Sequence, residues 1–299
     1  MDGNTVRANI MLITTAMIWG LAFVAQVVGM DYIEPFTFTA VRTLIGGIIL
    51  IPCIALLRHW WPYEPEVELT PEEQKSQRRI MLWGGLACGV VMFAATSLQQ
   101  IGLVYTTAGK AGFITALYIV LVPIFGIFFR RRVGLAVWLA VIIAVVGLYL
   151  LSIQQGFSMG RGDLLVLLAA IFYALHILVI GYFAPKVDGV KMSCIQFFVA
   201  GFICLVPMFV FENPEPSAIL SCWIPILYVG ILSTGVAYTL QVVAQSNTAP
   251  AIAALIMSME SVFAALFGWL ILNEMLSPRE LGGCALMLAA VILSQLSDN

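Results

Sequence analysis

The chain has 299 residues, of which 62% are hydrophobic and 10% are charged, and its formal net charge is −2. A chain this apolar could not stay in solution as a globular domain, so it is predicted to be an integral membrane protein. The small net charge gives no reason to expect nucleic acid as a partner.

The apolar residues form repeated segments of roughly 20 residues, the length at which a helix rising ~1.5 Å per residue crosses ~30 Å of hydrocarbon. Ten segments are predicted, at residues 8–29, 35–57, 80–104, 108–129, 133–153, 162–184, 192–211, 220–244, 249–272 and 280–296. The first apolar run is too long for a secretory signal and nine more follow, so we interpret it as the first helix. The predicted fold class is therefore an all-α membrane protein with ten transmembrane helices.

The distribution of Lys and Arg predicts the orientation, because cytoplasmic connections carry the excess of positive charge. If the N-terminus is cytoplasmic, ten basic residues fall inside and three outside, while Arg42 lies within a span. The inner set is Arg7, Arg58, Lys75, Arg78, Arg79, Arg130, Arg131, Arg132, Lys186 and Lys191, and the outer set is Lys110, Arg161 and Arg279. We therefore expect an inner-membrane protein with both termini in the cytoplasm.

Only one connection is long, at residues 58–79, and it is rich in glutamate. Within it, Thr70, Pro71 and Glu73 predict a capping box and a short helix that leads into the third span. We interpret this connection as a solvated linker in preference to a regulatory contact. The other connections are short, which predicts one helical bundle.

All six cysteines fall in or at the ends of spans and are interpreted as small buried hydrophobic residues.

The two halves of the chain resemble each other weakly. Gln100, Thr107 and Ala108 recur with identical spacing as Gln241, Thr248 and Ala249. Because each half has five predicted helices, an odd number, two such repeats would lie in the membrane with opposite topology. The predicted domains are residues 1–155, with helices 1 to 5 and the loop 58–79, and residues 156–299, with helices 6 to 10. Inverted repeats are typical of secondary transporters, which bind substrate near the midplane between the halves.

Several short motifs along the chain resemble those of a known family. They are W19-G20-L-A-F-V-A25, P35 followed by T39-A-V-R42, L121-V-P123, and M259-E260-S-V-F-A-A-L-F-G-W-L-I-L-N-E274 followed by L281-G-G-C-A-L-M-L-A-A-V. In this order they resemble the EamA-type members of the drug/metabolite transporter (DMT) superfamily. The resemblance implies a ten-helix bundle of two inverted repeats that exports or exchanges small metabolites, often amino acids or their derivatives, by alternating access.

One residue departs from the family pattern, which usually has proline after the glutamate of span 9. Ser261 stands there, while the first half keeps its proline as Pro123. A proline-induced kink is therefore not expected beside Glu260, although a serine hydroxyl can perturb a helix by donating to a backbone carbonyl.

Glu260 is the only charged residue between Ala249 and Leu272, and an unpaired charge at such a depth costs several kcal/mol. It shares a helix face with small residues such as Ala253 and Ala264, which predicts that it points into the protein. Its candidate partner is Arg42, the only Lys or Arg well inside a span.

Three interpretations of these two residues remain open. They could belong to a buried polar network that fixes helix packing. Glu260 could instead be a proton-coupling carboxylate, because burial favours its neutral form. Finally, either residue could contact a charged or zwitterionic substrate.

Neutral polar residues supply further candidates for a cavity. Thr234, Tyr238, Gln241 and Gln245 form a polar stripe along span 8, and Gln100 is the counterpart of Gln241 in the other half. Such a stripe suits a wet cavity, and the alternative is interhelical hydrogen bonding.

Aromatic residues and one histidine complete the candidate set. Tyr173 and His176 share a face of span 6, where His176 is either a neutral hydrogen-bonded group or a proton relay. Trp19 and Tyr118 are candidates for the cavity wall, or for ordinary packing.

The sequence lacks enzyme motifs. It has no H-E-x-x-H, no metal-ligand spacing, no phosphate-binding loop and only one carboxylate well inside a span, so neither an enzyme nor a cofactor or metal site is expected.

The predicted function is a secondary transporter that exports amino acids or related solutes, acting as a monomer with the proton as a candidate coupling ion. The alternatives are a carrier for a sugar or lipid-linked substrate, and a membrane scaffold or sensor that transports nothing.

Overall fold

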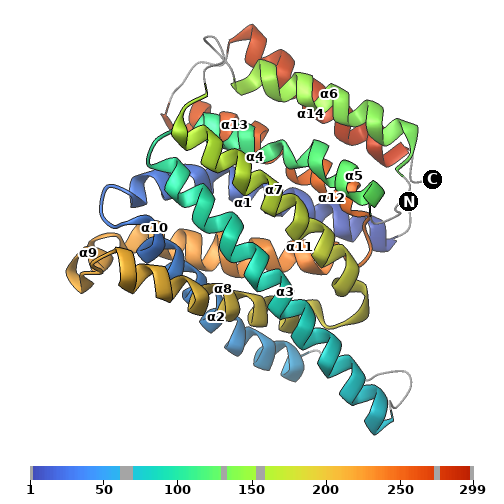
Figure 1. Cartoon of the computed structure of the whole chain (residues 1–299). Coiled ribbons are helices and arrows are strands. Elements are labelled where there is room, and N and C mark those ends of the chain that lie inside the picture. The colour runs from blue at the N-terminus through green and yellow to red at the C-terminus, as the bar shows by residue number, and fades with distance from the viewer. Residues whose placement is uncertain (1–2, 61–69, 129–132, 153–158, 273–276, 297–299) are drawn as a thin grey trace.

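The computed structural model describes residues 3–60, 70–128, 133–152, 159–272 and 277–296, and every regular element among them is a helix (Figure 1). The elements are α1 (Gly3–Gly29), α2 (Pro35–Trp60), α3 (Pro71–Leu103), α4 (Ala108–Ala116), α5 (Tyr118–Phe128), α6 (Leu135–Ser152), α7 (Arg161–Phe183), η1 (Ala184–Lys186), α8 (Gly189–Phe211), α9 (Pro216–Ser221), α10 (Trp223–Leu227), η2 (Tyr228–Tyr238), α11 (Thr239–Ala244), α12 (Pro250–Met257), α13 (Glu260–Leu272) and α14 (Pro278–Leu296). Among them η1 is a 3₁₀-helix and η2 is a π-helix. The all-α prediction is confirmed for the described residues.

Within the described residues, eight helical stretches are long and apolar enough to cross a membrane. They coincide with the predicted spans one to four and six to nine. The predicted fifth and tenth segments are the helices α6 and α14, which are not among the eight; the apolar stretch of α6, Leu135–Leu151, is shorter. The chain is thus a multi-pass membrane protein by the length and composition of its helices.

The start of α3 confirms the predicted capping box. The Thr70 side chain accepts a hydrogen bond from the Glu73 backbone N–H, and the Glu73 carboxylate accepts one from the Thr70 N–H at 2.8 Å. The predicted leading helix is continuous with span 3, because α3 runs unbroken from Pro71 to Leu103. Residues 61–69 of the predicted loop lie outside the described part of the chain.

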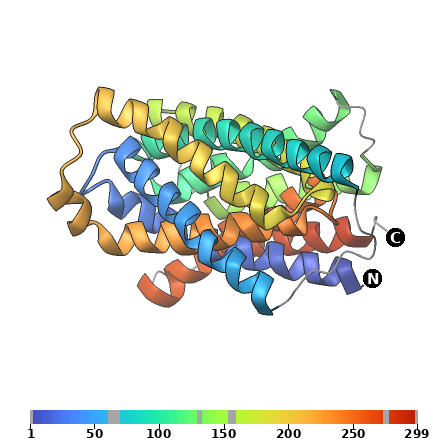
Figure 2. The same ribbon diagram turned by 90° about the horizontal axis from the view of Figure 1, so that it is seen from below.

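The first two helices of each half pack mainly against the other half. In the first half, α1 packs along η2, α11, α12 and α13, and α2 packs along α8 and η2. In the second half, α7 packs against α3, α4 and α5, and α8 packs against α2 and α3. The start of α1 and the end of α14 lie at the same end of the bundle, in both views (Figures 1 and 2). The two halves are interleaved in one bundle.

The helices α6 and α14 form a separate pair along one edge of the bundle (Figure 1). Their backbones meet at two glycines, since a Cβ added to Gly147 would lie 2.9 Å from the Gly283 carbonyl oxygen, and one added to Gly283 would lie 2.7 Å from the Gly147 oxygen. Small residues allow helix backbones in a membrane to approach this closely.

The six cysteines are free thiols, and their environments differ from one another. Cys88, Cys204 and Cys222 are buried as predicted, and Cys194 and Cys284 are partly buried. Cys53 is exposed on the helix surface, so the prediction of burial is wrong for this residue. The position of a residue within an apolar span does not reveal whether its side chain faces lipid or the interior of the protein.

A carboxylate from the second half caps the first turn of α2. Glu212, at the end of α8, accepts hydrogen bonds from the backbone N–H groups of Phe36 and Thr37 at 2.7 and 2.6 Å, and from the Thr37 hydroxyl at 2.7 Å. The first N–H groups of a helix have no partner within the helix, and its N-terminus favours negative charge. Glu212 therefore fixes the start of α2 to the end of α8.

We expect Glu212→Ala to lower the melting temperature of the detergent-purified protein clearly. The change leaves the buried Thr37 N–H and the part-buried Phe36 N–H without an acceptor, and loss of an acceptor costs about 1–3 kcal/mol for a buried group. Glu215→Ala is the matched control, because the Glu215 side chain makes no capping hydrogen bond and is exposed. Equal melting temperatures for the two variants would contradict a capping role for Glu212.

Candidate functional site

Two of the predicted spans are broken near their centres. Span 4 consists of α4, which ends at Ala116, and α5, which begins at Tyr118. Span 9 consists of α12, which ends at Met257, and α13, which begins at Glu260. Both breaks leave backbone groups and helix ends inside the bundle, where they can contact a bound solute.

The break in span 9 forms without a proline beside Glu260. The Ser258 hydroxyl donates to the Leu255 carbonyl at 2.7 Å, and the Ser261 N–H donates to the Ser258 carbonyl at 3.2 Å in a tight turn. The departure from the family pattern at Ser261 therefore does not remove the interruption, and Glu260 lies in the first turn of α13. A carboxylate there is stabilised by the positive end of the helix dipole.

The glycine of the W19-G20 motif brings α1 against this break. A Cβ added to Gly20 would lie 2.8 Å from the Glu260 carbonyl oxygen and 2.9 Å from the Ala264 nitrogen. Only glycine fits such a close approach of two backbones. The contact brings the neighbouring Trp19 and the Glu260 side chain to the same cavity.

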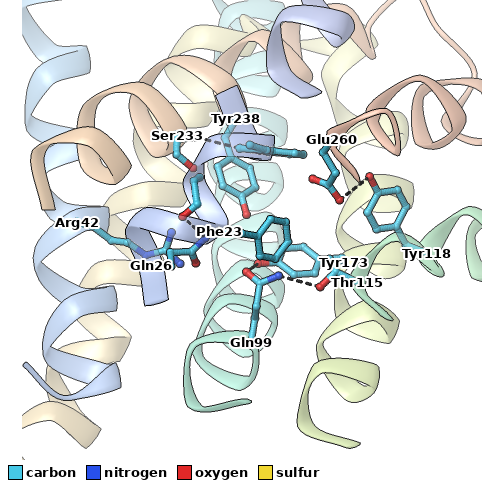
Figure 3. Close-up of a pocket in the computed structure, with 12 residues that line it drawn as sticks. Phe23, Gln26, Arg42, Gln99, Thr115, Tyr118, Tyr173, Ser233, Tyr238 and Glu260 are labelled. Atoms are coloured by element: carbon cyan, nitrogen blue, oxygen red, sulfur yellow. Dashed lines mark hydrogen bonds between the residues drawn. The ribbon is translucent and has the colours of Figure 1, made fainter. Parts of the chain in front are cut away.

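A buried pocket with about 360 Å³ of empty space, including its opening, lies between these helices (Figure 3). Its lining comes from both halves of the chain: Trp19, Ala22, Phe23, Gln26, Arg42, Gln99, Thr115, Tyr118, Tyr173, Ser233, Tyr238 and Glu260. Among the described residues, no group of three or more His, Cys, Asp or Glu side chains is arranged to hold a metal ion. The lining combines aromatic rings with a small number of polar and charged groups, as ligand pockets commonly do.

The two charged residues of the pocket do not pair with each other. Glu260 is 3% exposed and Arg42 is 2% exposed, yet the ion pairs within the described residues are Lys110–Asp163 and Lys191–Asp188. Figure 3 shows Arg42 on one side of the pocket and Glu260 on the other, with the Phe23 and Tyr173 rings between them. The pocket thus has a basic side and an acidic side.

Within the described residues, the Glu260 carboxylate accepts one hydrogen bond, from the Tyr118 hydroxyl at 3.3 Å. Tyr118 is the first residue of α5, so this contact joins the breaks of spans 4 and 9 across the pocket (Figure 3). A single long hydrogen bond satisfies a buried carboxylate poorly, because a carboxylate has room for several donors. Glu260 therefore keeps the capacity to bind a proton or a cationic group.

Two nitrogens of the Arg42 guanidinium, Nε and Nη2, are buried and have no hydrogen-bond partner within the described residues. The guanidinium carbon lies 5.9 Å from the centroid of the Phe38 ring, which provides a weak cation–π contact. A buried cation with unused donors is unfavourable unless an anionic or polar group completes it.

Neutral polar groups on the floor of the pocket are linked to one another. The Tyr173 hydroxyl donates to Gln99 Oε1 at 2.9 Å, and Gln99 Nε2 donates to the Thr115 hydroxyl at 3.0 Å (Figure 3). On the opposite wall, the Trp19 indole donates to the Ser233 carbonyl at 3.3 Å. These bonds fix the orientation of the side chains that surround the cavity.

Tyr238 forms the aromatic wall of the pocket together with Trp19. Their ring centroids are 4.7 Å apart, and the rings of His176 and Phe197 lie behind Tyr238 at 5.9 and 6.3 Å. Aromatic side chains give a cavity a large apolar surface while their polar atoms keep hydrogen bonds at its edge.

Of the predicted site residues, six line this pocket and three do not. The six are Trp19, Arg42, Tyr118, Tyr173, Tyr238 and Glu260. The other three bond elsewhere: Gln100 Nε2 donates to the Gln26 carbonyl, Gln241 Nε2 donates to Gln245 Oε1, and a ring nitrogen of His176 is 3.0 Å from Gln196 Oε1. Their contribution to a cavity remains a prediction, and in this conformation they connect helices.

The polar stripe of span 8 does not line one cavity. Of its four residues only Tyr238 reaches the pocket, and Gln245 donates to the Ile177 carbonyl on α7. The stripe was inferred from α-helical spacing, but Thr234 and Tyr238 lie in a π-helix, whose wider turn changes the angle between these two side chains.

The remaining pocket residues were not predicted. They are Ala22 and the larger side chains Phe23, Gln26, Gln99, Thr115 and Ser233. For Gln26, Gln99 and Thr115, a polar side chain within an apolar span was the available signal. Gln100 was predicted instead of its neighbour Gln99, because Gln100 has the counterpart Gln241 in the other half. The structure directs Gln99 into the pocket and Gln100 toward the α1 backbone.

Comparison with known proteins identifies the family. The model of the EamA-like transporter family matches residues 6–153 and 160–296. An uncharacterized transporter of Archaeoglobus fulgidus is 32% identical over 97% of this chain and 86% of the relative. The uncharacterized transporter YoaV of Bacillus subtilis is 24% identical over 97% of both chains. The uncharacterized inner membrane transporter YedA of Escherichia coli K12 is 24% identical over 93% of this chain and 87% of the relative.

A solved crystal structure shows the same fold. It aligns with a TM-score of 0.76 over 97% of this chain and 96% of that chain, at 17% sequence identity. Together with the family match over nearly the whole sequence, these similarities identify the chain as a multi-pass membrane transporter. It belongs to the EamA-like transporter family, within the DMT superfamily.

Proposed function

We propose that the protein is a secondary active transporter that exports amino acids or related small solutes across the inner membrane by alternating access, with Glu260 as the proton-coupling residue. The single observation that carries this proposal is the buried pocket between two broken helices, with Arg42 on one side and Glu260 on the other. Charged residues inside membrane spans mark substrate and ion pathways, and discontinuous helices supply such sites in transporters.

The two helix breaks support the proposal of inverted repeats at residues 1–155 and 156–299. Ala116 ends α4 and Met257 ends α12, and each follows its repeated threonine, Thr107 or Thr248, by the same number of residues. Interrupted spans at corresponding places in two halves indicate a binding site at their interface. In this proposal α6 and α14 complete the ten spans, and α6 packs along α14.

The proposed orientation places both termini in the cytoplasm. It is supported by the start of α1 and the end of α14 lying at one end of the bundle, and by the excess of Lys and Arg in the connections assigned to the inside. Arg130, Arg131 and Arg132 contribute to that excess but lie outside the described residues. The pocket lies within one chain, which supports a monomer as the transporting unit.

A thermal-shift screen of the detergent-purified protein tests the substrate class. We expect amino acids to raise the melting temperature and sugars to leave it unchanged, because a ligand at about 100 times its Kd stabilises the folded state by about 2.7 kcal/mol. Amino acids that stabilise the protein should then exchange across liposomes that contain it, and protein-free liposomes are the control.

Transport of a sugar or lipid-linked solute without any amino acid would overturn the proposed substrate class. If no solute moves in liposomes, and Glu260→Gln leaves every cellular phenotype intact, a scaffold or sensor role would replace transport.

A further inference from the structure

Arg42 and Gln26 carry unused hydrogen-bonding atoms toward the same side of the pocket, away from Glu260 (Figure 3). Arg42 has two buried nitrogens without a partner, and Gln26, which is 4% exposed, has a buried amide oxygen without a partner. Buried polar atoms are nearly always hydrogen-bonded in folded proteins, so these unpaired donors and this unpaired acceptor, which lie in one cavity, are available to a bound solute.

The orientation of the Gln26 amide is determined by the backbone. Its Nε2 donates to the Ala22 carbonyl at 3.2 Å, so exchanging the nitrogen and oxygen would place two acceptors against each other. The amide oxygen is therefore the atom that is free to accept. Gln26 is itself held in place, because its backbone carbonyl accepts a hydrogen bond from Gln100 at 3.2 Å.

The chemistry of the two side chains defines the group that they would bind. A guanidinium binds a carboxylate through two parallel N–H donors, and a neutral amide oxygen accepts from an ammonium or amino N–H. A molecule with a carboxylate and an N–H donor on the same carbon satisfies both at once. That arrangement is the head group of an α-amino acid.

We infer that Arg42 and Gln26 form the head-group site of the pocket, with Arg42 binding the carboxylate of an α-amino acid and Gln26 accepting from its amino group. The side chain of the amino acid then lies against the Trp19, Phe23 and Tyr238 rings. Glu260 and Tyr118, on the opposite side, do not bind the head group, which leaves the Glu260 carboxyl available to carry a proton. The inference rests on the proposed transport of amino acids and names the residues that recognise them.

Binding of matched analogues to the purified full-length protein tests the assignment. The probes are L-phenylalanine and L-leucine, each compared with its amide, its decarboxylated amine and its desamino acid. We expect the amide and the amine to bind on the order of 30-fold more weakly or worse, because they leave the buried guanidinium unpaired. The desamino acid should bind about tenfold more weakly, because it leaves the Gln26 oxygen unpaired.

Two variants assign each preference to its residue. Arg42→Lys keeps the charge but loses the planar fork, and should reduce the preference for the acid over the amide. Gln26→Met keeps the size of the side chain but removes the acceptor, and should abolish the preference for the amino acid over the desamino acid. Arg161→Gln, at the exposed start of α7, is the control and should keep both ratios.

The ratio of two affinities measured on one variant does not depend on the fraction of that variant that is folded. If a variant cannot be purified, the binding series on the wild type alone tests the proposed site. Equal binding of acid and amide by the wild type overturns the carboxylate site. Loss of the amino preference in Glu260→Gln but not in Gln26→Met overturns the role of Gln26. Failure of every amino acid to bind or move would instead refute the proposed substrate class, and the inference with it.

Discussion

Replacing Glu260 by glutamine is expected to abolish the response of transport to a pH gradient while leaving exchange of the solute intact. A carboxyl group can bind and release a proton in each cycle, whereas an amide of the same shape cannot. For each proton exchanged for one solute molecule, one pH unit supplies up to about tenfold accumulation. This accumulation is the quantity that the variant should lose.

The measurement uses liposomes that contain the purified protein and an amino acid identified by the thermal-shift screen. Uptake is recorded with and without an imposed pH difference and again after the gradient is collapsed with a proton ionophore. Glu215→Gln, at an exposed carboxylate outside the pocket, is the control and should respond as the wild type does. A Glu260→Gln protein that still accumulates solute along the gradient would remove Glu260 as the coupling residue.

Substitution of alanine at two adjacent glycines of α14 should have opposite consequences. A Cβ at Gly283 would lie 2.7 Å from the Gly147 oxygen and 2.8 Å from the Leu151 nitrogen, both backbone atoms that cannot rotate away. A Cβ at Gly282 would meet no atom within 4 Å. The expected cost of Gly283→Ala is about 1–3 kcal/mol or more through overpacking, while Gly282→Ala should be neutral or slightly stabilising.

Melting of the two variants in the same detergent tests the contact between α6 and α14. Because the glycines are neighbours in the sequence, hydrophobicity and helix propensity change equally, and only the position relative to α6 differs. A lower melting temperature for Gly283→Ala alone is expected. Equal melting temperatures would show that the two helices do not pack through Gly147 and Gly283.

Helices were predictable from the sequence because apolar length is a direct requirement of the bilayer, whatever the helix packs against. The predicted start of α3 was confirmed for a different reason, since Thr70 and Glu73 bond within one turn and need no distant partner. Features determined by local chemistry or by the thickness of the membrane could therefore be read from the residues alone.

The breaks in spans 4 and 9 were not predictable from apolar length, because both segments are long and apolar enough overall to form one continuous helix. The kink expected in the family pattern depends on proline, yet span 9 is interrupted with Ser261 in that place. In span 4, Pro123 lies within α5, and the interruption comes earlier, at Leu117. Tertiary packing, such as the close approach of Gly20 to Glu260, determines where these helices end.

The candidate site was predicted in part. Glu260 and Arg42 were found because charge inside a span is rare, and this signal does not depend on knowing the neighbours. The choice between Gln99 and Gln100 needed those neighbours, because adjacent residues point to different faces of a helix. The same limit applies to His176, which shares a face with Tyr173 yet lies behind Tyr238.

The interleaving of the two halves determines which parts of the protein can move together. The start of α2 is fixed to the end of α8 by Glu212, and α1 packs along the helices of the second half, so neither half of the sequence can rotate as an independent rigid body. In the proposed alternating-access cycle, a change of access to the pocket would instead divide the molecule between groups of helices drawn from both halves. In the proposed cycle, α2 with Arg42 would move together with α8, and α1 with Trp19 would move together with α13.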